Sequence, residues 1–409
     1  MTDVDVIRDL AKQFAEAVAD PRYDELRELW RAHNSLEPTR PLIYTRWDAC
    51  WTEVIEPHLV CTDEFCRAYE RQLRAELFRH SLSDDFIVEP WVTMRAAFVP
   101  RGESPWGPRY GRIPTTEKGG SWKFDPPIKQ LGDIDKLVVP EHKIDEDETA
   151  RQYDKLSDLL DGIVPIQVDR TPYYIGFGGD ISTAIVYLRG LEQLMWDMAD
   201  NPEWLHGLLG FMRDGILKAQ AEAERQGHFQ LHSHTNQAMP YSRELDDPVL
   251  DSPPVTRDKL WCYMAAQEFT LISPAMHDEF LLQYQLPIMA PYGLVAYGCC
   301  EDLTKKIDML RKVPNLRRVA VTPVADVPKC AEQIGTDYVM SWRPNPSQMV
   351  CCGMDEELIR RITTDALQAT RGQHIDITLK DVQTVEGDPT RLKRWVDITR
   401  ECIDKVWKG

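Results

Sequence analysis

The sequence predicts an α/β protein, a closed (β/α)8 barrel preceded by a helical extension. Eight short runs rich in β-forming residues follow one another along the chain from residue 86 onward. Helical patterns separate these runs, and strands that alternate with helices pair in parallel through right-handed crossovers. The chain has 409 residues, a length that α/β barrels with insertions reach as one domain.

Residues 1–85 form the predicted helical extension. Asp3 precedes an apolar stripe of helical spacing that includes Ile7, Leu10 and Phe14. A second stripe, from Phe65 to Leu77, has the same spacing. We therefore place a boundary after residue 85 and assign 86–409 to the barrel.

The eight runs are the predicted strands of this barrel. They are Phe86–Val92, Ile163–Val168, His228–His232, Leu260–Ala266, Leu294–Gly298, Arg318–Thr322, Tyr338–Trp342 and His374–Leu379. The alternative is an open doubly wound sheet. The absence of a Gly-rich dinucleotide motif after the first run weighs against it.

The segment Arg101–Pro127 follows the first run and is rich in Gly, Pro, Ser and Trp, with little periodicity. Long loops without regular structure in a compact domain are usually functional. We predict that this segment is a lid over the barrel mouth, and an ordered surface excursion is the alternative.

Composition and charge exclude several classes of partner. The formal net charge is −18, so nucleic acid and anionic membrane surfaces are poor partners. No apolar run approaches the roughly 20 residues that span a bilayer, and the N-terminus does not resemble a signal peptide. Ten cysteines without a dense disulfide pattern indicate a reducing cytoplasm.

In barrel enzymes the active site lies at the carboxyl ends of the strands, and polar side chains follow nearly every run. The candidates for catalysis are Glu268, Glu301, Arg343, Lys380 and Asp381. A buried glutamic acid donates protons, and an arginine clamps a carboxylate or phosphate. The candidates for substrate binding are Trp91, Tyr173, Tyr241 and Asn345.

A metal site is also predicted at these ends. Glu268, Cys299 and His234 are the preferred ligands, with His232 and Cys300 as further candidates. Thiolate, imidazole and carboxylate together suit Zn²⁺ with one open position. The structural alternatives are hydrogen-bonded core histidines and buried free cysteines.

Several motifs resemble the uroporphyrinogen decarboxylase superfamily. They are Phe269–Pro274 with Glu279-Phe280 and Pro287, Gly190–Glu192, Met198–Glu203, and Pro344–Pro346. The stretch Tyr297–Cys300 lies where the methyltransferase members of that superfamily carry a His-x-Cys zinc motif.

The departures from the family pattern narrow what the resemblance implies. The Arg-rich N-terminal signature of the decarboxylase is absent, Tyr297 replaces the zinc-motif His, and Lys380-Asp381 stands where a final Cys is usual. The resemblance implies a corrinoid-dependent methyltransferase of the O-demethylase type. It would transfer a methyl group from a small methoxylated or methylated molecule to a corrinoid on a separate protein, with zinc assistance, and a homodimer is allowed.

Two other functions stay open at this point. One is a cofactor-free decarboxylase or lyase of the same superfamily. The other is a non-catalytic barrel that binds a tetrapyrrole or a corrinoid partner.

Overall fold

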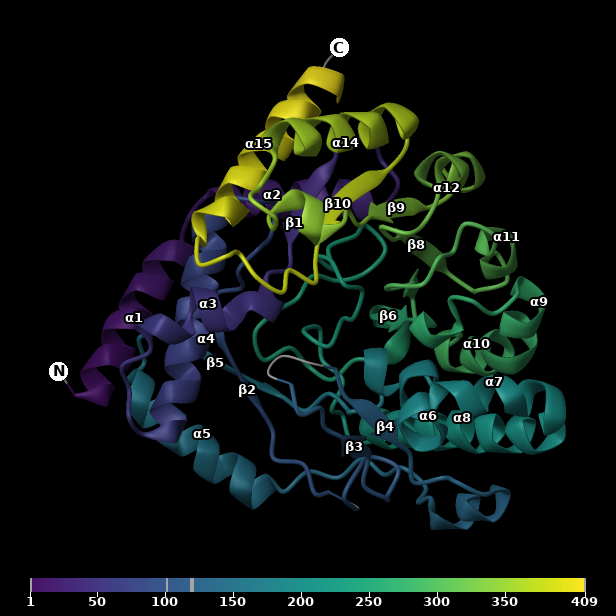
Figure 1. Ribbon diagram of the computed structural model, residues 1–409. Coiled ribbons are helices and arrows are strands. Elements are labelled where there is room, and N and C mark those ends of the chain that lie inside the picture. Colours follow the sequence, from purple (N-terminus) through teal and green to yellow (C-terminus); the bar gives the residue numbers. More distant parts are fainter. Residues whose placement is uncertain (1, 101, 118–120, 408–409) are drawn as a thin grey trace.

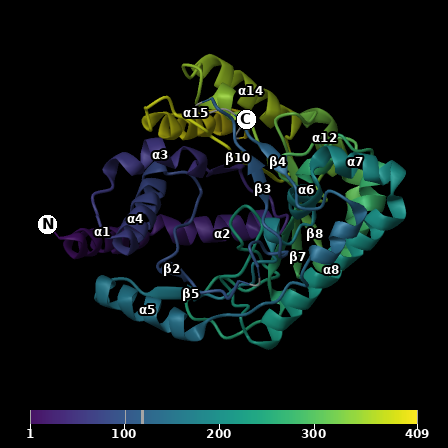
Figure 2. The ribbon, with the colours of Figure 1, turned by 60° about the horizontal axis from the view of Figure 1, so that its bottom comes forward.

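The computed structural model describes residues 2–100, 102–117 and 121–407, and helices lie around the strands of its main sheet (Figures 1 and 2). Six parallel strands form the main sheet in the order β1-β10-β9-β8-β7-β6. Their bounds are β1 Leu42–Thr45, β6 Trp261–Met264, β7 Leu294–Tyr297, β8 Leu316–Val321, β9 Val339–Trp342 and β10 Ile375–Leu379. A second parallel pair joins β2 (Val92–Arg95) to β5 (Ile166–Asp169).

The helices precede, separate and follow these strands. The N-terminal helices are α1 Asp3–Val18, α2 Arg22–Asn34, α3 Trp51–Val54, α4 Glu64–Leu82 and α5 Glu146–Leu160. The middle helices are α6 Ser182–Arg189, α7 Leu191–Asp200, α8 Pro202–Arg225, α9 Pro274–His277 and α10 Gln283–Met289. The last are α11 Ile307–Leu310, α12 Val327–Ile334, α13 Pro346–Met349, α14 Glu356–Ala369 and α15 Thr390–Trp407. None of these described helices is long and apolar enough to cross a membrane.

The observed architecture is therefore mixed α/β with parallel strands. Every residue of β1, β6, β7, β9 and β10 is buried, as expected for parallel strands covered on both faces. In the described part of the chain, no strand ladder joins β1 to β2 or β5 to β6. Closure into a barrel and the domain boundary at residue 85 stay predictions.

Strand β1 corrects the expectation that residues 1–85 are wholly helical. It pairs with β10 from Leu42 opposite Asp376 to Thr45 opposite Leu379. All four residues are buried, so the strand lacks the alternation that marks a half-exposed strand. A short apolar run between helices cannot be assigned from periodicity alone.

Two of the predicted strands are also corrected. The run Phe86–Val92 begins pairing only at Val92, because Pro90 has no N–H to donate to a ladder. The run His228–His232 is not a strand. Its chain turns, with the backbone N–H of Ser233 bonded to the Gln230 carbonyl at 2.8 Å.

The predicted lid contains regular structure. Strands β3 (Gly111–Ile113) and β4 (Lys123–Asp125) form an antiparallel hairpin. Its aromatic side chains surround Tyr187 of α6, whose ring stacks on Tyr110 with centroids 5.1 Å apart. Arg101 and residues 118–120 of the predicted lid lie outside the described residues, and its lid role stays a prediction.

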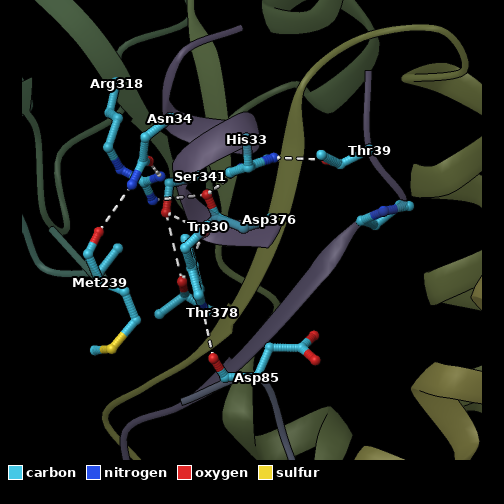
Figure 3. Close-up of polar contacts among 12 residues, drawn as sticks. Trp30, His33, Asn34, Thr39, Asp85, Met239, Arg318, Ser341, Asp376 and Thr378 are labelled. Carbon is cyan, nitrogen blue, oxygen red and sulfur yellow. Dashed lines mark hydrogen bonds and ion pairs between the residues drawn. The ribbon is translucent and has the colours of Figure 1, made fainter. Parts of the chain in front are cut away.

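A buried polar network, which we call the closed network, joins the end of α2 to the main sheet (Figure 3). Its members are His33, Asn34, Arg318, Ser341, Asp376 and Thr378. Arg318 Nη2 lies 2.6 Å from Asp376 Oδ2, and these side chains are 2% and 0% exposed. The Asn34 amide oxygen accepts from Arg318 at 2.8 Å. Each charge in this network therefore has a partner, as stability requires of buried charges.

Candidate functional site

Four side chains that follow strands of the main sheet meet at its carboxyl edge. Cys299 and Cys300 follow β7, Arg343 follows β9 and Lys380 follows β10. Lys380 Nζ lies 3.0 Å from the Cys299 Sγ and 3.1 Å from the Cys300 Sγ. We call these four residues the thiol site.

The backbone around Cys299 is fixed by its neighbours. Gly298 has φ +102°, and a Cβ there would lie 2.8 Å from a methyl group of Leu303. Only glycine adopts this conformation readily. The Cys299 N–H donates to Glu301 Oε2 at 2.8 Å, and the Cys299 carbonyl accepts from Arg343 Nη1 at 2.7 Å. The turn therefore holds the thiol in one place.

Cys299 is set up to be a thiolate. The Cys300 thiol, whose Sγ lies 3.6 Å away, donates to it and lowers the pKa of Cys299, and the charges of Arg343 and Lys380 lower it further. Burial acts in the opposite direction and is outweighed. The pKa of Cys299 therefore lies well below its usual value. The pKa of Cys300 is raised, first because its proton is shared with Cys299.

Some hydrogen-bonding groups and a positive charge at the thiol site have no hydrogen-bond or carboxylate partner in the part of the protein that the structure describes. Arg343 is 3% exposed, and in the described part of the chain it makes no ion pair with a carboxylate. Its Nε has no hydrogen-bond partner there, and neither has the Oε1 of Gln237, whose amide nitrogen lies 3.9 Å from the Cys299 Sγ. Unpaired buried polar groups are costly, and a ligand or an ordered water would satisfy these two.

Two buried carboxyl groups, of Asp180 and Glu301, and the half-buried carboxyl group of Glu268 lie near the thiol site. Burial raises the pKa of Glu268, of Glu301 and of Asp180. Glu301 accepts two backbone hydrogen bonds and braces the turn. Glu268 accepts from the Ser182 hydroxyl. Glu268 is therefore the carboxyl group best placed to hold a proton near the thiolate.

A strained turn at Ile181 lies next to the Glu268 carboxyl group. Ile181 has φ +65° and ψ −47°, and the Ser182 N–H bonds back to the Asp180 carbonyl at 2.7 Å. This is a tight three-residue turn of the rare, strained hand. Positive φ is an outlier for a β-branched residue, and such strain clusters at functional sites. The turn holds Asp180 and Ser182 on either side of Ile181, next to Glu268.

The predicted zinc ligands do not fit a metal ion. Within residues 2–100, 102–117 and 121–407, no group of three or more His, Cys, Asp and Glu side chains could hold one. Lys380 stands against both sulfur atoms, where it would repel a cation. His234 uses its Nδ1 to accept from the Trp261 N–H at 3.2 Å. Zinc binding stays a prediction that the metal content of purified protein would test.

The remaining candidates lie in other places. Trp91, His232 and His234 line a separate pocket of about 310 Å³. The Tyr241 hydroxyl donates to Glu89 at 2.5 Å and is buried. Tyr173 is 53% exposed.

Two candidates beside the thiol site have local contacts. Asn345 caps α13 by accepting from the Ser347 N–H at 3.0 Å. Asp381 pairs with Lys380 at 2.8 Å, and its Oδ2 lies 3.7 Å from the Cys300 Sγ. Asp381 therefore borders the thiol site, whereas Asn345 has a structural partner of its own.

Sequence reasoning missed Asp180, Ser182 and Gln237. The first two precede and open a helix, where such residues are normally read as caps. Gln237 comes from an irregular segment that no strand or helix pattern places. The strained turn at Ile181 has no sequence signal, since β-branched residues rarely adopt it.

Comparison with known proteins supports the fold. The structure is similar to a solved methyltransferase from Methanosarcina mazei, with a TM-score of 0.53 and 12% identity. The match covers 92% of this chain and 98% of that chain. No protein-family model and no curated protein matches the sequence. At this identity the likeness establishes a shared fold, and the superfamily assignment stays a prediction.

Proposed function

We propose that this protein is a methyltransferase that moves a methyl group from a small methylated or methoxylated molecule to a corrinoid on a separate protein. The observation that carries the proposal is the Cys299 sulfur beside the buried cations Lys380 and Arg343 at the carboxyl edge of the main sheet, with the Glu268 carboxyl group near it. The fold that holds them is similar to that of a methyltransferase. A closed barrel belongs to the same proposal.

The residues of this chain would act on the methyl donor. As the bond to the methyl carbon lengthens, that carbon becomes more positive. The Cys299 thiolate places a fixed negative charge near it, and preorganised charge is an effective way to stabilise a transition state. Protonated Glu268 gives its proton to the oxygen or other atom that leaves. The corrinoid, when bound, supplies the electron pair that takes up the methyl group.

Arg343 and Lys380 would orient the donor. Both are buried cations at the site, and the Arg343 Nε has no hydrogen-bond partner among the described residues. A guanidinium binds carboxylate or other planar oxygen groups with defined geometry. A methoxylated molecule with an acidic group therefore suits the site better than a neutral one.

The test is methyl transfer to reduced free cobalamin under anaerobic conditions, with a panel of methoxylated arenes and methylamines as donors. Product methylcobalamin is followed by absorption and mass spectrometry. We expect Cys299→Ala to lower the rate by about 100-fold or more, the scale of one lost transition-state contact. Cys402→Ala, which removes a buried thiol of α15, should keep the rate. Equal rates in wild type and Cys299→Ala would contradict the proposal.

The unpaired Arg343 also favours a second candidate, a cofactor-free decarboxylase. There Arg343 would hold a substrate carboxylate and Glu268 would protonate the carbon left after CO2 departs. Release of CO2 from a carboxylated substrate without corrinoid, together with no methyl transfer, would favour this second function.

A further inference from the structure

Two adjacent cysteines of the thiol site, Cys299 and Cys300, have their sulfur atoms in contact. Successive side chains of an extended strand point to opposite faces, but the chain bends at these two residues, shortly after β7. The two Sγ atoms lie 3.6 Å apart. The bond of a disulfide is about 2.0 Å long, so the sulfur atoms need to approach by less than the length of one such bond.

A single ammonium group contacts both sulfur atoms. Lys380 Nζ lies 3.0 Å from the Cys299 Sγ and 3.1 Å from the Cys300 Sγ. A cation next to a thiol favours the thiolate, which is the form that attacks an oxidant. Either sulfur atom can be the donor in the contact between them, so Cys300 can pass its proton to Cys299 and become the thiolate.

The pair is accessible from the side of Cys300. This residue is exposed, whereas Cys299 is 3% exposed. An oxidant in solution therefore reaches Cys300 first, and Cys299 lies beside it as the second thiol. Redox-sensitive cysteines have the same arrangement, an accessible sulfur next to a resolving cysteine.

The chain contains a second adjacent pair, Cys351 and Cys352, which provides an internal comparison. The Cys351 thiol donates to the Thr384 carbonyl at 3.0 Å, and Cys352 is exposed. Among the described residues, no hydrogen bond joins these two sulfur atoms and no lysine contacts either of them. The two pairs therefore share adjacency in sequence and differ in the sulfur contact and the ammonium group.

We infer that Cys299 and Cys300 form a reversible disulfide when the protein meets a peroxide. The Cys300 sulfur attacks one peroxide oxygen, so that an S–O bond forms, the O–O bond breaks and hydroxide leaves and takes up a proton. The Cys299 sulfur then attacks the sulfur of this sulfenic acid, and the hydroxyl group leaves with the remaining thiol proton as water. One hydrogen peroxide and two thiols thus give one disulfide and two water molecules.

This disulfide would be easy to reduce. Neighbouring Cα atoms lie about 3.8 Å apart, below the roughly 4.4–6.8 Å of ordinary disulfides. The resulting strain makes such a bond more reducible, and strained or exposed disulfides are the labile ones. The inference rests on the contacts of the cysteine pair and does not depend on methyl transfer.

Peptide mapping of the folded full chain after treatment with hydrogen peroxide tests the inference. Free thiols are alkylated after the treatment, and chymotrypsin cleaves after Tyr297, which separates the pair from Cys262. We expect the Cys299–Cys300 peptide to lose two hydrogen atoms and to escape alkylation, and dithiothreitol to restore both thiols. The Cys351–Cys352 peptide should stay alkylated at the same dose of peroxide.

Two variants test the roles of the neighbours. Cys299→Ser leaves Cys300 without a resolving thiol, so peroxide should convert Cys300 to sulfinic and sulfonic acids, which dithiothreitol does not reduce. Lys380→Met should slow disulfide formation by about tenfold or more, because a nearby opposite charge shifts a pKa by about 1–3 pH units and so sets the thiolate fraction.

Three results would overturn the inference. They are two alkylated thiols at Cys299 and Cys300 after the treatment, a disulfide from either of them to another cysteine, and equal oxidation of the Cys351–Cys352 pair. The wild-type map alone is decisive if a variant does not fold. It is read without methyl transfer, so a disulfide in a protein that transfers no methyl group would contradict only the proposed function.

Discussion

The closed network and the thiol site lie along the same strands. The buried charges of the closed network are paired with opposite charges, whereas the thiol site contains a buried cation without a carboxylate partner in the described part of the chain. Successive residues of one face of a strand are two apart. Asp376, Thr378 and Lys380 therefore share a face of β10, as do Ser341 and Arg343 at the end of β9. At one end Arg318 meets Asp376, whereas at the other Arg343 meets no carboxylate among the described residues.

This difference distinguishes buried polar residues that stabilise the fold from buried polar residues that are available to bind a ligand. The closed network stabilises the junction of α2 with the sheet, because each of its buried charges is paired. The thiol site holds two cations against one thiolate, with Asp381 at its rim. Its Arg343 Nε, which has no partner among the described residues, costs free energy and is available to a hydrogen-bond acceptor. Burial alone does not distinguish the two regions, but hydrogen-bond satisfaction does.

The largest effect should come from breaking the closed network. Asp376→Ala would leave Arg318 buried without a counter-charge and should cost about 3–5 kcal/mol of unfolding free energy. Arg343→Met removes a cation that has no carboxylate partner among the described residues but that donates to the buried Cys299 carbonyl, and it should cost about 1–3 kcal/mol. Denaturant unfolding of both variants measures the contrast. Similar losses in the two would mean that the thiol site is also structural.

The second prediction concerns the thiolate. Lys380→Met removes a cation 3.0 Å from the Cys299 sulfur. A nearby opposite charge shifts a pKa by about 1–3 pH units, so the thiolate titration midpoint should rise by that amount. Ultraviolet thiolate absorbance as a function of pH measures it. Cys330→Ala, which removes a buried thiol elsewhere, should leave this titration in place. An unchanged midpoint in Lys380→Met would show that the ammonium does not stabilise the thiolate.

The third prediction concerns the acid. Burial raises the pKa of Glu268, while the Ser182 hydroxyl lowers it in part. A proton donor works only below its pKa, so activity should fall as pH rises through that value. Ser182→Ala removes the lowering contact and should move the alkaline limb of the rate profile to higher pH. Glu268→Gln cannot donate a proton and should abolish that limb along with most activity. If the alkaline limb stays at the same pH in Ser182→Ala, a group other than Glu268 causes that limb.

The sequence predicted the alternation of strands and helices because amphipathic helices such as α8 and α14 carry clear apolar spacing. It predicted residues at the sheet edge because strand ends are visible as changes from apolar to polar. It did not predict β1, whose four buried residues have no alternation. It could not predict which polar residues are paired, because pairing joins positions far apart, such as Arg318 and Asp376.

The side-chain contacts of the predicted zinc ligands show the same limit. Cysteine, histidine and glutamate at successive strand ends suit a metal, but their side-chain directions depend on the turns that follow each strand. At this edge Glu268 is held by Ser182, and Cys299 is held by Lys380. The only sign in the sequence was a basic residue, Lys380, directly after β10, whose ammonium group offsets the charge of the Cys299 thiolate.

The smallest effect compares two threonines, one in the closed network and one at the end of β8, outside it. Thr378 and Thr322 are both fully buried, and valine has nearly the same shape as threonine. The Thr378 hydroxyl donates to Asp376 at 3.0 Å, whereas in the described part of the chain the Thr322 hydroxyl, at the end of β8 next to Arg343, has no partner. A hydrogen bond to a charged group contributes about 1.5–3 kcal/mol, so Thr378→Val should destabilise by that amount. Thr322→Val removes an unsatisfied hydroxyl and should change the unfolding free energy by about 0.5 kcal/mol or less, or stabilise the fold. Chemical denaturation of the two variants reads the difference directly. Equal destabilisation would mean that the Thr322 hydroxyl is satisfied in solution and that the two regions differ less than their contacts indicate.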